Sequence, residues 1–554
     1  MVLTKGLHVR LSNILIAVFL VFIFYHTARY WRQRQGGAIL IDLDEDVGSG
    51  LSPEEEYLER LIDTYGLANL TKWQAWRIQP SGRDDEGSSM TDVHVNFESQ
   101  AEKVIDLREP SRADLHAAKM LVLPIRSGAR VEETDASDFL FGISTSYERM
   151  ADRDWAVFRA WKRWLTKGKK RGNGAGLVLM LDKATTEQLH EVDQMLHDAG
   201  IDAYTTATDE PMSMARRYYE LVRILKTYGA TLAASGQRKR WFGVVEDTVF
   251  FPSLSYLRAR LAAYDANEPL VIGLPSERLD WHEDDDSITT SGGGAVLLTR
   301  EAVAAIPRLS CLEVDDSGLP VRPKRWDALL KECVKTRAGL DMHVIPAFYS
   351  PNDAEAAAAS HETGVRPLVL HDYQDRYRLD VGMAHLVADV CGEACFMQRY
   401  VFRDDWVLVN GVSISQHPDG LAPRHAQDRD RDRGSEHGDG AGDGGGGGSG
   451  SNNEQAETPQ RKRVTGQLVI DDDAAARGQG PGRTPALAWT GRRNVWRLLD
   501  SAAAADGAVW QAYLKKGARR RAAPEGDGGD GGDGGDGGDE MDSVIVLIWE
   551  NNTR

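Results

Sequence analysis

Cysteine and positive charge are both scarce in this chain, and each shortage excludes a class of protein. Four cysteines among 554 residues are too few for a disulfide-stabilised scaffold. Acidic residues outnumber basic ones by 84 to 66, and the net charge of −18 argues against a general nucleic-acid binder. Cys391 and Cys395 could close a small loop, and Cys311 and Cys333 could form a second pair. The alternative for each is a buried free thiol.

One apolar run near the N-terminus has the composition of a membrane helix. Residues 11–25 are almost wholly apolar, and Tyr30 with Trp31 would extend the run to the roughly 20 residues that span a bilayer. A cleaved signal peptide is the alternative, but no clear small-x-small cleavage site follows the run. We therefore expect a cytoplasmic tail over 1–10, an uncleaved signal anchor over 11–31 and a lumenal body.

Composition divides the rest of the chain. Residues 32–135 are polar with Glu-rich and Ser/Gly-rich patches, which favours a stem region. Apolar runs alternate with helical patterns over 136–418 and predict an α/β domain with a mostly parallel sheet. Residues 419–485 are rich in Asp, Arg, Gly and Ser and predict a disordered linker. The remainder, 486–554, contains a second low-complexity run at 524–540, and we expect its last strand to dock on the folded domain.

The elements expected in the α/β domain follow from the spacing of apolar residues. Short apolar runs predict strands, and apolar residues three or four apart predict helices. Beyond the domain, we expect a helix over Val495–Leu514. The strands expected within the domain are Phe139–Thr145, Leu177–Asp182, Ile201–Thr205, Trp241–Val245 and Leu270–Gly273, and the helices are 148–165, Thr186–Ala199 and Met214–Leu232.

A buried strand that ends in two acids is the most informative stretch. Glu246 and Asp247 directly follow the apolar run Trp241–Val245. Such acids are costly to bury unpaired, and ligands bind at this edge of an α/β sheet. Their hard oxygen atoms suit Mg²⁺ or Mn²⁺ holding a diphosphate. The alternative is a solvated acidic turn.

Glycine and serine-threonine positions mark other points along the same expected edge. Gly292, Gly293 and Gly294 precede an apolar strand, and three glycines allow a ligand to approach the backbone closely. The alternative for them is a flexible turn. Polar residues also end the first two expected strands of the domain: Ser144 and Thr145 end the first, and Asp182 ends the second.

Eight segments between Asp138 and about Pro418 occur in an order that resembles one known family. They read D-F-L-F-G-I-S-T-S, L-V-L-M-L-D, R-Y-Y-E-L-V, W-F-G-V-V-E-D-T-V-F-F-P-S-L, G-G-G-A-V-L-L-T, W-D-A-L-L-K-E-C, R-P-L-V-L-H-D-Y and A-H-L-V-A-D-V-C-G-E-A-C-F-M-Q-R-Y. The chain resembles the Fringe-like, family 31 inverting glycosyltransferases, most of all their fungal membrane-anchored branch. The resemblance covers about half of the chain and implies a GT-A fold, a Rossmann-like domain that binds a nucleotide sugar.

The resemblance also implies a metal site. The family's acidic triplet falls on Glu246, Asp247 and Thr248. Thr248 departs from the family, whose third acid binds the metal directly. His371, in R-P-L-V-L-H-D-Y, stands where the family keeps a second metal ligand. The implied ion is Mn²⁺ or another divalent cation.

Further roles come with the same resemblance. Asp327 lies six residues before Cys333, as the family's catalytic base does. The alternative for Asp327 is an N-cap of the helix that follows it, a role compatible with that of a base. Ser144, Thr145 and Asp182 are placed to touch uridine and ribose. The pocket where donor sugar meets acceptor would be lined by Gly292, Gly293 and Gly294.

We therefore expect a Mn²⁺-dependent transferase that passes a sugar from a UDP-sugar donor to a hydroxyl of a glycan or glycoprotein, with inversion. It would be a type II protein of the Golgi or ER membrane. One alternative is a catalytically silent homologue that binds glycans or acts as a chaperone, which Thr248 favours. Another is a membrane-tethered structural or adhesion protein with the Gly-rich tracts as spacers.

Overall fold

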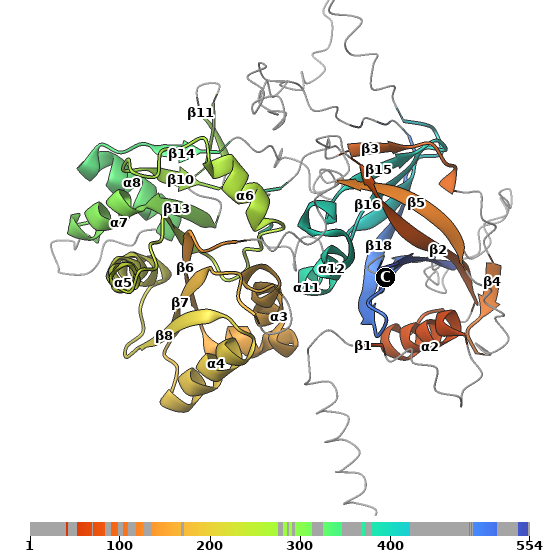
Figure 1. Ribbon diagram of the computed structural model, residues 1–554, viewed down its shortest axis with the longest axis horizontal. Helices are drawn as coiled ribbons and strands as arrows, with labels where there is room; N and C mark the ends of the chain where they lie inside the picture. Colours follow the sequence, from red (N-terminus) through yellow and green to blue (C-terminus); the bar gives the residue numbers. More distant parts are fainter. Residues whose placement is uncertain are drawn as a thin grey trace, which may run out of the picture.

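Two β-sheets with their covering helices organise the folded part of the chain (Figure 1). In this computed structural model the expected tail and anchor, and nearly all of 419–485, lie outside the described residues. Within the described part, no helix combines the length and apolar character needed to traverse a bilayer. The structure describes residues 40–41, 52–68, 70–83, 90–97, 103–108, 118–126, 135–167, 171–274, 281–284, 287–290, 294–312, 325–345, 367–371, 379–421, 487, 489, 491–517 and 541–551.

Among the described residues, the first sheet has seven strands in the order β14-β10-β13-β9-β6-β7-β8. Strands β9, β6, β7 and β8 run parallel, whereas β13 is antiparallel to both of its neighbours. The α/β class is therefore confirmed, with a mixed sheet. The strands are β6 Phe139–Thr145, β7 Gly176–Asp182, β8 Asp202–Thr208, β9 Trp241–Val245, β10 Val271–Gly273, β13 Ala295–Thr299 and β14 Met342–Val344.

Helices cover both faces of this sheet (Figure 1). Apolar residues of α5, α7 and α8 share one buried cluster, and those of α3, α4 and α6 belong to another. Side-chain caps start several helices; for example, the Ser146 hydroxyl accepts a hydrogen bond from the Arg149 amide. The helices are α3 Tyr147–Leu165, α4 Thr186–Asp198, α5 Met214–Ala234, α6 Leu254–Leu261, α7 Arg300–Ala305 and α8 Trp326–Ala338; the lesser elements are β11 Trp281–Asp284, β12 Ser287–Thr290 and η3 Ile306–Arg308.

In the part of the chain that the structure describes, the second sheet has eleven strands and joins distant parts of the sequence. Strands from 70–126, the region expected to be a stem, lie in it beside strands from 399–416 and from the C-terminal segment. The last strand, β20, pairs in parallel with β2 over eight residues. The strands are β1 Leu40–Ile41, β2 Leu70–Arg83, β3 Met90–Val93, β4 Lys103–Asp106, β5 Lys119–Arg126, β15 Arg399–Phe402, β16 Trp406–Val409, β17 Ser413–Gln416, β18 Asn494–Ala504, β19 Val509–Lys515 and β20 Asp542–Trp549.

The helix expected over Val495–Leu514 is wrong, because this stretch forms the antiparallel strands β18 and β19. Pairing with β17 and β20 on either side overrides the helical preference of its alanines. Asp500 in β18 is fully buried and accepts hydrogen bonds from Tyr57, Arg60 and Tyr65 of α2, Pro53–Tyr65. This network fixes α2 against the sheet.

Both expected disulfides are present. Cys311 and Cys333 join the chain after η3 to α8, and Cys391 and Cys395 lie within the short helical segment that leads into β15. The alternative of buried free thiols is therefore excluded. The short elements of that segment are α11 Val381–Ala384, η4 His385–Val387, α12 Ala388–Cys391 and η5 Glu393–Cys395.

The junction between the two sheets is made by α3 and this short helical segment. Arg159 pairs with Asp380 at 3.0 Å, and Arg163 pairs with Asp389 at 2.7 Å. Between these pairs, the His385 ring accepts from Arg163 through Nδ1 and donates through Nε2 to a backbone carbonyl. Burial, with a smaller effect of the Arg163 charge, lowers the pKa of His385 to about 3.

This junction predicts a pH-dependent stability. In the unfolded chain a histidine has a pKa near 6.5, whereas the pKa of buried His385 is about 3. Between about pH 6.5 and pH 3 the unfolded state therefore binds a proton that the folded state does not, so the free energy of unfolding falls as the pH drops through this range. Replacing His385 by Gln should flatten the slope of the unfolding free energy by up to about 1.4 kcal/mol per pH unit between about pH 4 and 6. Urea unfolding across this range measures it.

The matched control is His190→Gln, because His190 is exposed on α4. We expect its slope to equal that of the unmodified chain. An unchanged slope in the His385 variant would show that His385 does not couple protonation to folding.

Candidate functional site

The carboxyl ends of β9, β6 and β7 meet at one edge of the first sheet. These strands are parallel neighbours, so the residues that follow or end them come together in space. Glu246 follows β9, Thr145 ends β6 and Asp182 ends β7. The structure thus brings the expected acids and nucleotide-binding residues to a common edge.

Glu246 lies between two aromatic nitrogen atoms. Its Oε1 accepts a hydrogen bond from Trp326 Nε1 at 2.8 Å, and its Oε2 lies 2.9 Å from His371 Nε2. Its backbone amide donates to the carbonyl of Gly294 at 2.8 Å. The side chain is only 11% exposed and that of His371 is fully buried. The alternative of a solvated acidic turn therefore does not describe this position.

The contact between Glu246 and His371 needs a positive charge or a proton between its two atoms. An ionised carboxylate oxygen and an unprotonated ring nitrogen are both acceptors. A proton on Nε2 satisfies the contact, and so does a cation bound by both atoms. The observed separation of 2.9 Å is that of an ordinary hydrogen bond.

Asp247 faces the start of α3 instead. Its Oδ2 accepts hydrogen bonds from Thr145 Oγ1 at 2.5 Å and from Arg149 Nε, which forms an ion pair with it. Its backbone carbonyl accepts from Trp161 Nε1 at 3.0 Å. Thr248 follows and is half-buried. Of the four residues expected at a metal, the structure pairs Glu246 directly with His371, while Asp247 is held by α3.

A divalent ion would therefore find few protein ligands here. Within the described ranges, no group of three or more His, Cys, Asp and Glu side chains is placed to hold a metal. Two ligands suffice for an ion that arrives on a diphosphate, since Mg²⁺ is usually held by one or two carboxylates together with substrate phosphates and water. Glu246 offers one such carboxylate, whereas His371 would add a nitrogen ligand, which suits Mn²⁺ better than Mg²⁺.

Arg217 connects the ends of β6 and β7, and sequence reasoning missed it. Its Nε donates to Ser144 Oγ at 3.0 Å, and its Nη1 pairs with Asp182 Oδ2 at 2.9 Å. Ser144 and Thr145 are each 3% exposed, so both act by positioning their neighbours. Asp182 is only partly buried. Arg217 is the first residue of the segment R-Y-Y-E-L-V, which contributed to the family resemblance, but it was not among the predicted site residues.

Tyr218, the next residue of α5, closes the back of the site. Its hydroxyl donates to the carbonyls of Val245 and Ser144, at 3.2 and 3.4 Å. Its ring stacks on Trp326 with the centroids 4.5 Å apart. Burial, followed by the nearby acid charges, raises the pKa of Tyr218 well above its usual value, so the hydroxyl remains a donor. The stack holds the indole that binds Glu246.

Asp327 begins α8 beside this indole and is fully buried. Both of its carboxylate oxygens accept from Arg325, and Oδ1 also accepts from the Ala328 amide at 2.9 Å. The helix begins at Trp326 with Arg325 at its N-cap, so the expectation that Asp327 is the N-cap is wrong. Asp327 lies one residue from a contact of Glu246, and its role as a base stays a prediction.

Gly294 is the described member of the glycine triplet; Gly292 and Gly293 lie outside the described residues. Its φ of +85° is in the left-handed region, and an added Cβ would lie 2.9 Å from His371 Nε2. The glycine therefore lets the strand approach the histidine that contacts Glu246.

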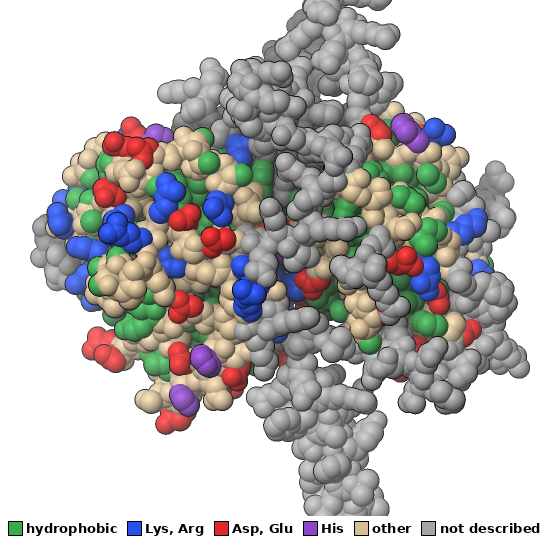
Figure 2. All heavy atoms as spheres, viewed as in Figure 1, with side chains coloured by type: hydrophobic (Ala, Val, Ile, Leu, Met, Phe, Trp, Pro, Cys, Tyr) green, Lys and Arg blue, Asp and Glu red, His purple; other side chains and the backbone are tan. Residues whose placement is uncertain are grey.

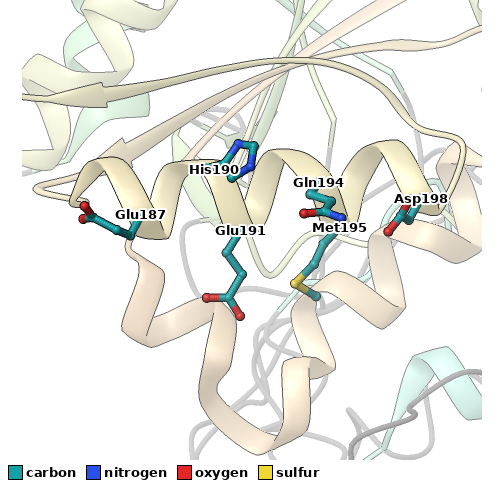
Figure 3. A pocket seen from close by; sticks show the side chains of 6 residues that line it. All are labelled: Glu187, His190, Glu191, Gln194, Met195 and Asp198. Carbon is teal, nitrogen blue, oxygen red and sulfur yellow. The ribbon is translucent and has the colours of Figure 1, made fainter.

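A groove on α4 lies apart from the residues described so far. Its volume is about 420 Å³. Figure 3 shows Glu191 and Met195 pointing from α4 toward the segment beneath the helix, and the Tyr147 hydroxyl donates to Glu191 at 2.8 Å. In Figure 2 acidic and basic side chains are mixed over the visible face of the part of the protein that is built around the first sheet. The groove is lined by Glu187, His190, Glu191, Gln194, Met195 and Asp198.

No family model and no curated protein matches the chain by sequence. Among solved structures, it is similar to the glycosyltransferase GlyE of Streptococcus pneumoniae TIGR4, with a TM-score of 0.27 and 11% identity over 42% of this chain and 54% of that one. The chain thus spans about half of the length of GlyE. It is also similar to mouse xyloside xylosyltransferase 1, with a TM-score of 0.25 and 9% identity over 42% of this chain and 96% of that one.

A third similar structure is a glycosyltransferase involved in glycosylation of the major capsid of PBCV-1, with a TM-score of 0.23 and 13% identity. It matches over 44% of this chain and 100% of that one. At such TM-scores the likeness carries no argument about function, and the proposals below rest on the site.

Gly294→Ala tests the close approach to His371. The variant should lose about 1–2 kcal/mol from backbone strain and about 1–3 kcal/mol more from the crowded imidazole. Gly236→Ala is the matched control, because Gly236 has a φ of +91° and nothing within 4 Å of an added Cβ. Urea unfolding compares them, and equal losses would show that the approach to His371 is not tight.

Proposed function

We propose that this protein is a glycosyltransferase of the GT-A type, which passes a sugar from a UDP-sugar to an acceptor hydroxyl with inversion. The observation that carries the proposal is the buried Glu246–His371 pair at the carboxyl ends of the parallel strands of the first sheet. The sequence segments that resemble the Fringe-like transferases surround this pair. Anchoring in the Golgi or ER membrane, with a glycan or glycoprotein acceptor, belongs to the same proposal.

In this proposal the ends of β6 and β7 bind the nucleoside. Asp182 is partly exposed and would accept hydrogen bonds from ribose hydroxyls. Arg217 holds its carboxylate in place, and Ser144 in turn orients Arg217. Thr145 would not contact the nucleoside directly, because its hydroxyl donates a hydrogen bond to Asp247. Buried polar groups that are already paired keep this geometry before the donor arrives.

Glu246 and His371 would hold a divalent ion, Mn²⁺ or Mg²⁺, that comes with the donor. When bound, the ion would offset the charge that develops on the diphosphate leaving group. Trp326 keeps one oxygen of Glu246 occupied, so that the other points at His371. Gly294 leaves the imidazole the room that it needs.

Asp327 is the proposed general base. A base has to lie within about 3 Å of the hydroxyl proton that it removes, and Asp327 is now buried and paired with Arg325. The side chain of Arg325 is 36% exposed, and its pair with Asp327 would have to open for the acceptor to reach the carboxylate. Asp327 would then accept the proton as the acceptor oxygen attacks the anomeric carbon from the face opposite the diphosphate.

Asp327→Asn is the direct test of this role. The amide cannot take up the proton, so we expect transfer to fall by a factor of about 10² to 10⁴. The affinity for UDP should stay within about twofold, because the carboxylate is not part of the nucleotide edge. Release of UDP from a panel of UDP-sugars measures turnover, and calorimetry measures the affinity.

Asp341→Asn is the control, because Asp341 is an exposed carboxylate just beyond α8. Its turnover should match that of the unmodified protein. Full activity in the Asp327 variant would show that the base lies elsewhere.

A catalytically silent homologue is the second candidate. Two features favour it. Thr248 stands where the resembling family has a metal-binding acid, and the proposed base Asp327 is occupied by an ion pair with Arg325. Such a protein would bind UDP or glycans without releasing UDP from any donor. The donor panel therefore separates the two candidates.

A further inference from the structure

The pairing of Arg149 with Asp247 is not explained by a metal-binding role for Asp247. Arg149 stands in the first turn of α3, which begins two residues after β6 ends. Its guanidinium forms an ion pair with the buried Asp247 through Nε. Yet 56% of the Arg149 side chain is exposed, against 9% for Asp247. An exposed cation is thus held at the edge where the donor would bind.

We propose that Arg149 binds the diphosphate of the donor and that Asp247 holds its guanidinium in position for this contact. The inference rests on the proposed function and adds a charge that the protein itself supplies. A guanidinium has five N–H donors in a planar fork, which matches two phosphate oxygens. The hydrogen bond described for this guanidinium runs through Nε to Asp247, and 56% of the side chain is exposed.

The charge at this edge supports the assignment. Glu246 and Asp247 are both buried acids, and a diphosphate would bring further negative charge to them. An ion bound by Glu246 and His371 would offset part of that charge. Asp247 is already bonded to Thr145 and Arg149, and Thr248 is neutral. Among the described residues, Arg149 is a cation that lies on the Asp247 side of this edge.

The backbone of α3 departs from helical geometry a few residues after Arg149. Arg153, Asp154 and Trp155 have φ values of 49°, 55° and 59°, so three successive residues adopt the left-handed conformation. Each costs on the order of 1–2 kcal/mol relative to a right-handed helix. Strained backbone of this kind is concentrated at ligand-binding segments.

The helix beyond these residues is fixed. Arg159 and Arg163 bind Asp380 and Asp389, which belong to the junction with the second sheet. The first turn, with Arg149, is thus separated from the anchored part of α3.

Calorimetric titration of the purified protein with UDP, both in EDTA and with Mn²⁺, tests the assignment. Arg149→Gln should weaken UDP binding by about tenfold or more, because a charge-assisted contact is lost. Arg149→Lys keeps the charge but loses the fork, and should lie between. Uridine, which has no phosphate, should bind all three proteins within about twofold.

Arg223→Gln is the matched control, because the Arg223 side chain is also 56% exposed and also forms an ion pair, with Glu220 on α5. It removes the same charge and should leave UDP binding unchanged. Equal UDP affinity in the Arg149 and Arg223 variants would overturn the inference and leave the proposed function standing. A parallel loss of UDP and uridine binding would overturn it too, since it would indicate a structural role.

A different outcome would contradict the proposed function itself. If the unmodified protein binds UDP neither in EDTA nor with Mn²⁺, both the transferase proposal and this inference are overturned. Thermal unfolding of each variant, measured alongside, identifies any that does not fold.

Discussion

The site depends on how one buried carboxylate is held. Glu246 follows a strand in which all five residues are buried, and its two oxygens meet an indole and an imidazole. A buried carboxylate without partners would be strongly destabilising. The contacts with Trp326 and His371 therefore fix three separate parts of the chain around β9: the start of α8, the segment 367–371 and the strand end itself.

The surrounding structure supports this arrangement from both faces of the sheet. On one face, Tyr218 stacks on Trp326 and binds the ends of β6 and β9, while the Cys311–Cys333 disulfide ties α8 to the chain after η3. On the other face, α3 places Arg149 against Asp247. The two acids after β9 thus have different partners and, in our account, different roles toward the donor.

Much of the first sheet could be predicted from the sequence, because its strands are short apolar runs with polar ends. The pairing of Glu246 with His371 was anticipated only through the resemblance, since 125 residues separate them. The contacts of Trp326 and Arg217 could not be predicted, because their neighbours in sequence give no sign of which carboxylate they reach. Arg149 was missed for the same reason.

The second sheet was harder to predict than the first. Its strands come from regions on both sides of the α/β domain, and the polar composition of 70–126 favoured a stem. The alanines of β18 favour a helix locally, and only pairing with β17 and β19 makes the stretch a strand. Such pairing is a tertiary effect that no local pattern contains.

The central claim is that Glu246 and His371 form a metal edge completed by a nucleotide diphosphate. Electron paramagnetic resonance of free Mn²⁺ tests it most directly, with and without UDP, for the unmodified protein and for Glu246→Gln. The account predicts weak Mn²⁺ binding without UDP, strong binding with UDP, and loss of the strong binding in the variant. Strong Mn²⁺ binding that is indifferent to UDP or survives Glu246→Gln would contradict it.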